Sequence, residues 1–96
     1  MKMVMISYNE AMDSEVMEAL ANCGAKNYTK IAGVFGKGEA SGTHLGDDIW
    51  QGRNNVLYVA CGITEADKLL NCIKELRKRL GSEGIKAFTW DLSDIT

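Results

Sequence analysis

The sequence lacks the long apolar run that a membrane-spanning helix requires, and its first residues, MKMVMISYNE, do not follow a signal-peptide pattern. It also lacks a charge excess, because 11 basic and 13 acidic residues give a formal net charge of −2. A chain with no basic excess has little to hold a phosphate backbone. We therefore expect a cytoplasmic protein with no membrane insertion and no nucleic-acid partner.

The CxxC spacing of many zinc and redox sites is absent too. The three cysteines, Cys23, Cys61 and Cys72, are odd in number and fall inside predicted helices and strands. We interpret them as small buried apolar residues in a reducing cytoplasm. Neither a disulfide nor a zinc site is expected.

Motifs for catalysis are also missing. The single histidine, His44, has no evident nucleophile beside it, since Cys61 and Cys72 lie within predicted elements. Ser41 and Ser82 do not stand in a nucleophile-elbow sequence. We therefore expect a protein that binds and signals rather than an enzyme.

What the sequence does contain is a regular succession of apolar patterns. Alternation predicts strands, and apolar residues at helical spacing predict helices, the first of which Asp13 is expected to cap. The strands are predicted over 2–8, 28–35, 55–61 and 85–92, and the helices over 13–23 and about 64–80. With 96 residues we expect a single domain spanning 1–96. This order predicts an α+β, ferredoxin-like βαββαβ sandwich, in which two helices cover one face of a four-stranded antiparallel sheet.

Both faces of the predicted sheet are apolar. Met3 and Met5 alternate with the residues that should face the helices, so the second face needs cover of its own. Trp90 alternates with Phe88 in the last strand and is expected in the core. Self-association with the sheets packed inward would cover the second face, and we expect an oligomer.

A segment of nineteen residues, 36–54, joins the second and third strands and carries five of the ten glycines. Such a long connection in a compact domain is usually functional or disordered. Gly36, Lys37 and Gly38 bring backbone N–H groups and an ammonium together, as binding of an anion or phosphate requires. The same residues are also compatible with a flexible turn. Their spacing is neither that of a Rossmann fingerprint nor that of a Walker A motif.

The same segment contains a second group of polar residues. His44, Asp47 and Asp48 could hold a divalent metal such as zinc or copper, although residues of this kind on a loop are often merely solvated. Trp50 stands in polar surroundings and could pack against a neighbouring subunit or close over a ligand. Trp50 and Arg53 are the expected contacts to a partner.

The element order, the long loop and two stretches of sequence resemble the PII signalling proteins. The run Gly33-Val-Phe-Gly36-Lys37-Gly38, leading to Gly42-Thr-His44, resembles the Gly-Phe-Gly-Arg-Gln-Lys-Gly-His segment at the foot of the PII T-loop. Residues 12–20 are similar to the start of the first PII helix, and residues 42–54 look more like divergent PII-like proteins with a short T-loop. The trimeric CutA-type proteins, linked to metal tolerance, have a similar fold.

The resemblance implies a homotrimer that holds an adenine nucleotide or another small anion between subunits. Gly36 and Lys37 match the loop-base Gly-Arg that contacts nucleotide, and Lys86 loosely matches the lysine of the phosphate-binding B-loop. The expected ligand-binding residues are Gly36, Lys37, Gly38, Gly42 and Lys86.

Three hypotheses remain open. The first is a PII-like regulatory protein that senses a small-molecule effector and reports through the 36–54 loop to a target protein. The second is a metal-binding trimer that uses His44 with Asp47 or Asp48. The third is an adaptor subunit that docks a protein partner through the loop and Trp50.

Overall fold

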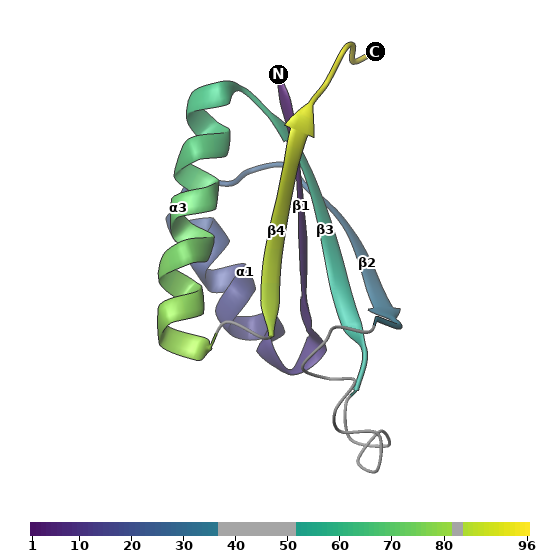
Figure 1. The fold of residues 1–96 in the computed structure, drawn as a ribbon, viewed down its shortest axis with the longest axis vertical. Helices are drawn as coiled ribbons and strands as arrows, with labels where there is room; N and C mark the ends of the chain where they lie inside the picture. The colour runs from purple at the N-terminus through teal and green to yellow at the C-terminus, as the bar shows by residue number, and fades with distance from the viewer. Residues whose placement is uncertain (37–51, 82–83) are drawn as a thin grey trace.

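The computed structural model describes residues 1–36, 52–81 and 84–96. Each element forms close to where the apolar pattern predicts it (Figure 1). In chain order the elements are β1 (Lys2–Asn9), a 3₁₀ turn (Glu10–Met12), α1 (Asp13–Asn22), β2 (Thr29–Val34), β3 (Asn54–Cys61), α3 (Ile63–Leu80) and β4 (Ile85–Asp91). Within the described ranges, no helix is both long and apolar enough to cross a membrane.

The four strands form one antiparallel sheet in the order β2-β3-β1-β4, with both helices on the same face (Figure 1). The predicted α+β ferredoxin-like sandwich is therefore confirmed. The central strand β1 pairs along its length with β3 on one side and with β4 on the other. The edge strands are β2 and β4, so the strand that leads into the 36–54 loop has a neighbour on one side only.

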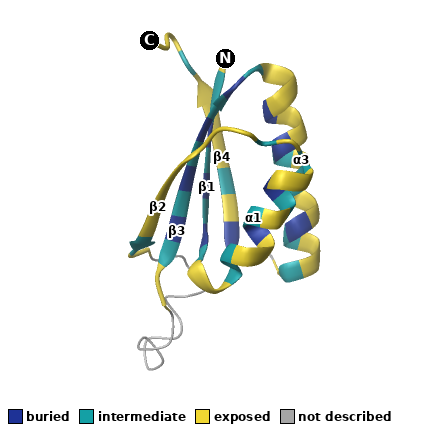
Figure 2. Cartoon of the chain, turned by 180° about the vertical axis from the view of Figure 1, so that it is seen from behind, coloured by how far each residue is buried: buried dark blue, intermediate teal, exposed yellow. Residues whose placement is uncertain are grey.

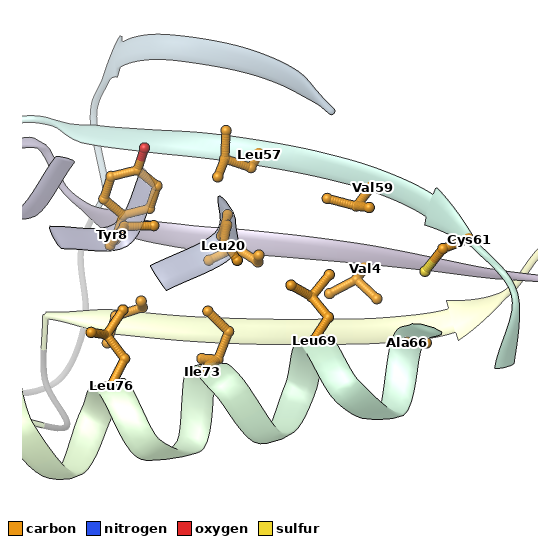
Figure 3. Packing of buried hydrophobic residues seen from close by; sticks show 13 residues of the cluster. Val4, Tyr8, Leu20, Leu57, Val59, Cys61, Ala66, Leu69, Ile73 and Leu76 are labelled. Atoms are coloured by element: carbon orange, nitrogen blue, oxygen red, sulfur yellow. The ribbon is translucent and has the colours of Figure 1, made fainter. Parts of the chain in front are cut away.

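The core lies between the helices and the sheet (Figure 3). Every second residue of β1 and β3 is buried on the helix side, as the pleat of a strand requires. Helix α3 supplies the opposite wall through residues at helical spacing. The buried apolar residues are Val4, Ile6, Tyr8, Val16, Leu20, Leu57, Val59, Cys61, Ala66, Leu69, Ile73, Leu76 and Ile85.

The other face of the sheet is apolar, as predicted, and no helix of the described residues covers it. The strand register places Met5 between Tyr58 and Phe88, and Met3 between Ala60 and Trp90. We call these residues, with the neighbouring positions of the same face, the open face.

The prediction that Trp90 lies in the core is wrong for the single chain. Phe88 and Trp90 are 48% and 43% exposed, since Ile85 and Ala87 occupy the helix side of β4. Strand β2 is largely exposed as well (Figure 2).

The expectation of unpaired cysteines is also wrong for two of the three. Cys23, directly after α1, forms a disulfide with Cys72 in the middle of α3, and their Cα atoms are 6.6 Å apart. Both side chains are partly exposed, whereas Cys61 is buried and free. Periodicity places each cysteine on its own helix, but only the packing of α1 against α3 brings the two together.

Candidate functional site

The foot of the 36–54 loop lies at one end of the sheet, where β2 ends and β3 begins (Figure 1). Of the residues predicted to form a site, Gly36, Arg53 and Lys86 belong to the described part of the chain. The other predicted site residues, Lys37, Gly38, Gly42, His44, Asp47, Asp48 and Trp50, lie outside it. The described part of the loop foot therefore consists of two stems: the outgoing stem at the end of β2 and the returning stem at the start of β3.

Two backbone hydrogen bonds tie the returning stem and the entry to β4 to the end of β1. The Glu10 N–H donates to the Arg53 carbonyl at 2.8 Å, just before β3 starts. The Asn9 N–H donates to the Gly84 carbonyl at 2.9 Å, just before β4 starts. The turn after β1 thus holds the returning stem of the loop and the entry to β4 in one place.

A β-bulge at Gly33 shapes the outgoing stem. The register runs from Ile31 opposite Val56 to Val34 opposite Asn54, so β2 contains one extra residue. Gly33 has a φ of +70°, a conformation that side chains with a Cβ rarely adopt. Its N–H donates to the side-chain Oδ1 of Asn55, in the neighbouring strand β3, at 3.1 Å.

A polar cluster beneath this bulge joins four elements. One carboxylate oxygen of Asp13 accepts hydrogen bonds from the Tyr8 hydroxyl at 2.6 Å and from the Asn55 amide at 3.1 Å, and lies 2.7 Å from the Lys30 ammonium. We call Tyr8, Asp13, Lys30 and Asn55 the loop-base cluster. It connects β1, the start of α1, β2 and β3.

The cluster shifts the pKa values of two of its members. The Lys30 ammonium and then the Tyr8 hydroxyl hold the pKa of Asp13 below its usual value. Burial, reinforced by the Asp13 carboxylate, raises the pKa of Tyr8 far above its usual range. Tyr8 therefore stays protonated and remains a hydrogen-bond donor at neutral pH.

The predicted role of Asp13 as a helix cap is wrong. Met12 occupies the N-cap position of α1 without a side-chain cap hydrogen bond, and Asp13 is the first helical residue. Its carboxylate turns to the cluster because Lys30 and Asn55 offer hydrogen-bond partners there, and bonds to a charged group are strong. Sequence reasoning missed the cluster, although a lone asparagine at an inward position of an apolar strand was a usable signal.

The two stems also meet through an exposed aromatic ring. The Arg53 guanidinium lies over the ring of Phe35, with Cζ 5.6 Å from the ring centroid. Phe35 is 86% exposed, so this contact belongs to the surface. A cation–π contact of this kind is worth about 0.5–1 kcal/mol at an exposed site. It keeps a positive charge at the foot of the loop.

Close packing explains two of the glycines at this end. A Cβ at Gly36 would collide with the side-chain amide of Asn54, and a Cβ at Gly84 would collide with the end of the Met12 side chain. The backbone at both places passes so near a neighbouring side chain that only glycine fits without movement.

Gly36 and Lys86 do not come together within one chain. Gly36 follows the edge strand β2, whereas Lys86 lies opposite Ser7 in the other edge strand, β4. Three interstrand steps separate the two edges, which amounts to roughly 14 Å. Lys86 points to the open face, because its neighbour Ile85 is buried on the helix side.

The described residues contain no cluster of three or more His, Cys, Asp or Glu side chains that could hold a metal ion. The metal site proposed for His44, Asp47 and Asp48 lies outside these residues and stays a prediction.

The family model for the nitrogen regulatory protein P-II matches residues 1–96, the whole sequence. The chain belongs to the PII family. The resemblance inferred from the loop and the first helix is thereby confirmed, although no curated protein matches the PII chain described here.

Solved structures of PII-like proteins share the fold. CPII from Thiomonas intermedia K12, bound to ADP, AMP and bicarbonate, has a TM-score of 0.70 and 18% identity, over 95% of this chain and 88% of CPII. The same protein bound to ADP, AMP and acetate has a TM-score of 0.71 and 19% identity, over 95% and 84% of the two chains. A candidate PII-like signaling protein from Thermus thermophilus has a TM-score of 0.61 and 20% identity, over 93% and 82%.

Proposed function

We propose that this chain is a PII-like regulatory protein of the cytoplasm, not an enzyme. It forms a homotrimer, binds an adenine nucleotide or another small anion between subunits, and reports through the 36–54 loop. The match of the PII family model to all 96 residues carries this proposal. The neighbour CPII, which shares the fold, is bound to ADP, AMP and bicarbonate in one of its solved structures.

The charges at the loop foot support an anionic ligand. Arg53 holds a guanidinium over Phe35 at the returning stem, and Gly36 is exposed at the outgoing stem. Guanidinium and backbone N–H groups are the donors that phosphates and carboxylates favour. Lys37 and Gly38, which follow directly in the sequence, would add an ammonium and a further N–H.

The position of Lys86 supports a site that is shared between subunits. Within one chain the two edge strands keep Lys86 away from Gly36. A second subunit could bring its own β4 edge next to the β2 edge of the first. One small ligand would then contact both groups only in the oligomer.

The open face supports the oligomer itself. Met3, Met5, Tyr58, Phe88 and Trp90 form an apolar surface that neither α1 nor α3 covers. Apolar surfaces of this kind on soluble proteins mark interaction sites. Closed cyclic symmetry lets identical copies cover the same face of each other.

The loop-base cluster supports reporting through the loop. Asn55 connects the Gly33 bulge to Asp13, so β2, β3 and α1 share one set of hydrogen bonds at the loop foot. A ligand that contacts either stem would change the strand ends from which the loop leaves. Differential contact of this kind is what couples a ligand to a conformational change.

The test is calorimetry with ATP, ADP, AMP and bicarbonate, combined with sedimentation to measure mass. We expect a particle of about three times the 10.5 kDa chain and heat with at least one ligand. Arg53→Ala should weaken binding, whereas Arg79→Ala, on the exposed side of α3, should not. A folded sample that gives no heat with any of these ligands refutes the nucleotide and anion proposal.

The metal hypothesis remains a separate prediction for the loop. Titration of copper and zinc into wild type and His44→Ala tests it, since loss of affinity in the variant is required. The adaptor hypothesis predicts a protein partner whose binding needs the loop and does not change with added ligand.

A further inference from the structure

The disulfide between Cys23 and Cys72 joins α1 to α3 at a partly exposed position. Cys23 follows the last turn of α1, and Cys72 lies in the middle of α3. Both cysteines are partly exposed and line an open groove between the two helices. The remaining lining residues of this groove are Ala19, Asn22, Lys68, Asn71, Glu75 and Leu76. Small molecules can therefore reach the two sulfur atoms.

The third cysteine provides an internal contrast. Cys61 is 7% exposed at the end of β3, in the core between helix and sheet. A buried thiol in apolar surroundings is inert, whereas an accessible pair can exchange with thiols and disulfides in solution. The chain thus contains one buried, protected thiol and one accessible pair of cysteines.

We propose that Cys23 and Cys72 form a reversible redox modification site whose reactant is a small disulfide such as oxidised glutathione. One cysteine thiolate attacks the small disulfide, forms a mixed disulfide and releases one small thiol. The second cysteine thiolate then attacks the mixed disulfide and releases the second small thiol. The two protein sulfurs lose two electrons and two protons, and the two released thiols carry them.

This reaction changes how firmly α1 is held against the rest of the fold. The helix has ten residues and buries only Val16 and Leu20, so its packing provides modest anchorage. The disulfide fixes its C-terminal end to α3, and Asp13 fixes its N-terminal end to the loop-base cluster. Reduction frees the C-terminal end of α1 from α3. The mobility of α1 then increases, and with it the mobility of Asp13 and Asn55. This inference does not depend on which ligand the loop binds.

Peptide mapping tests the bond itself. Trypsin places Cys23, Cys61 and Cys72 on three different peptides, namely 3–26, 54–68 and 69–74. After treatment of the folded protein with oxidised glutathione, we expect 3–26 joined to 69–74, and 54–68 alone. Dithiothreitol added to the folded protein should separate the pair and allow alkylation of both peptides. The proposal is overturned if the two thiols stay free after oxidation, or if the bond resists reduction while the chain is folded.

Hydrogen exchange tests the link to the loop foot. In the reduced protein we expect several-fold faster exchange in α1 and at the Gly33 N–H than in the oxidised protein. Cys72→Ser should exchange like the reduced wild type in both conditions, and Cys61→Ala should still respond to oxidation. Equal exchange in oxidised and reduced wild type would show that the bond does not influence the loop foot, and would overturn that part of the proposal.

Discussion

The side chain of Asn55 accepts a hydrogen bond from the backbone N–H of Gly33, the residue at which β2 leaves regular pairing with β3. A strand N–H at a bulge lacks its ladder partner, and a buried N–H without a partner is costly. Asn55, which is 5% exposed, replaces that partner from the neighbouring strand. Its amide then donates to Asp13, so the bulge and the start of α1 are held by one side chain.

Asn55→Ala should therefore destabilise the fold. The substitution leaves the Gly33 N–H without its acceptor and removes a donor from Asp13, which we expect to cost about 1–3 kcal/mol. Urea unfolding measures this loss. Asn71→Ala, at an exposed position of α3, is the control and should change stability by less than about 0.5 kcal/mol. Equal effects of the two substitutions would contradict the role assigned to Asn55.

Gly33 should tolerate asparagine better than valine. Its φ of +70° is a left-handed conformation that costs roughly 1–2 kcal/mol for a residue with a Cβ, most for β-branched residues and least for asparagine. Space is not the obstacle, because a Cβ there would lie 3.6 Å from Arg53 Cδ. Comparison of the unfolding midpoints of Gly33→Asn and Gly33→Val tests this. A valine variant as stable as the asparagine variant would show that the bulge relaxes.

Asp13 should make the protein sensitive to acid. Its pKa is lowered in the fold, so the folded state binds this proton less tightly than the unfolded chain does. The stabilisation is complete above the unfolded pKa of about 4 and is lost as the pH falls through the lower folded value. Urea midpoints of wild type and Asp13→Asn should therefore differ most at neutral pH and converge in acid. A difference that does not depend on pH would indicate that the charge of Asp13 is not involved.

Removal of the disulfide should matter only under oxidising conditions. The bond closes a loop between positions 49 residues apart, and such a crosslink typically adds about 2–4 kcal/mol. Cys72→Ser should be less stable than oxidised wild type by about this amount and should match reduced wild type. Thermal unfolding with and without dithiothreitol gives the comparison. The prediction fails if reduced wild type is as stable as oxidised wild type.

A charge on the open face should prevent self-association. Trp90→Lys places an ammonium among Met3 and the other apolar residues of this surface, where an oligomer would bury it. Sedimentation should then detect single chains, while Lys74→Ala, at an exposed position of α3, should leave the assembly unchanged. A Trp90→Lys protein of unchanged mass would place the interface elsewhere.

The arrangement of elements can be predicted because local patterns report it. The third strand is predicted at 55–61 and found at Asn54–Cys61, and the first helix is predicted at 13–23 and found at Asp13–Asn22. Apolar alternation and helical spacing depend only on which side of an element is buried. These patterns therefore do not require knowledge of the neighbours.

The wrong predictions concern residues whose contacts are determined by segments far away in the sequence. The face of β4 that meets the helices depends on its register with β1, so the sequence alone assigns Trp90 to the wrong side. The partners of Asp13 come from β2 and β3, far away in the sequence, and a capping preference is only a local rule. Cys23 and Cys72 meet through helix packing for the same reason. At the candidate site, the structure gives the positions of Gly36, Arg53 and Lys86. Their roles toward a ligand stay predictions.

The central position of β1 has a consequence for the order in which the chain can fold. Its partners run from Asn54 to Cys61 in one strand and from Ile85 to Asp91 in the other, so β1 pairs with residues that are synthesised much later than itself. Contacts between positions so far apart slow folding, because a large chain loop must close, at a cost in entropy, before strand pairing can stabilise the chain. On the ribosome, β1 must therefore wait until both β3 and β4 have emerged before both of its edges are covered.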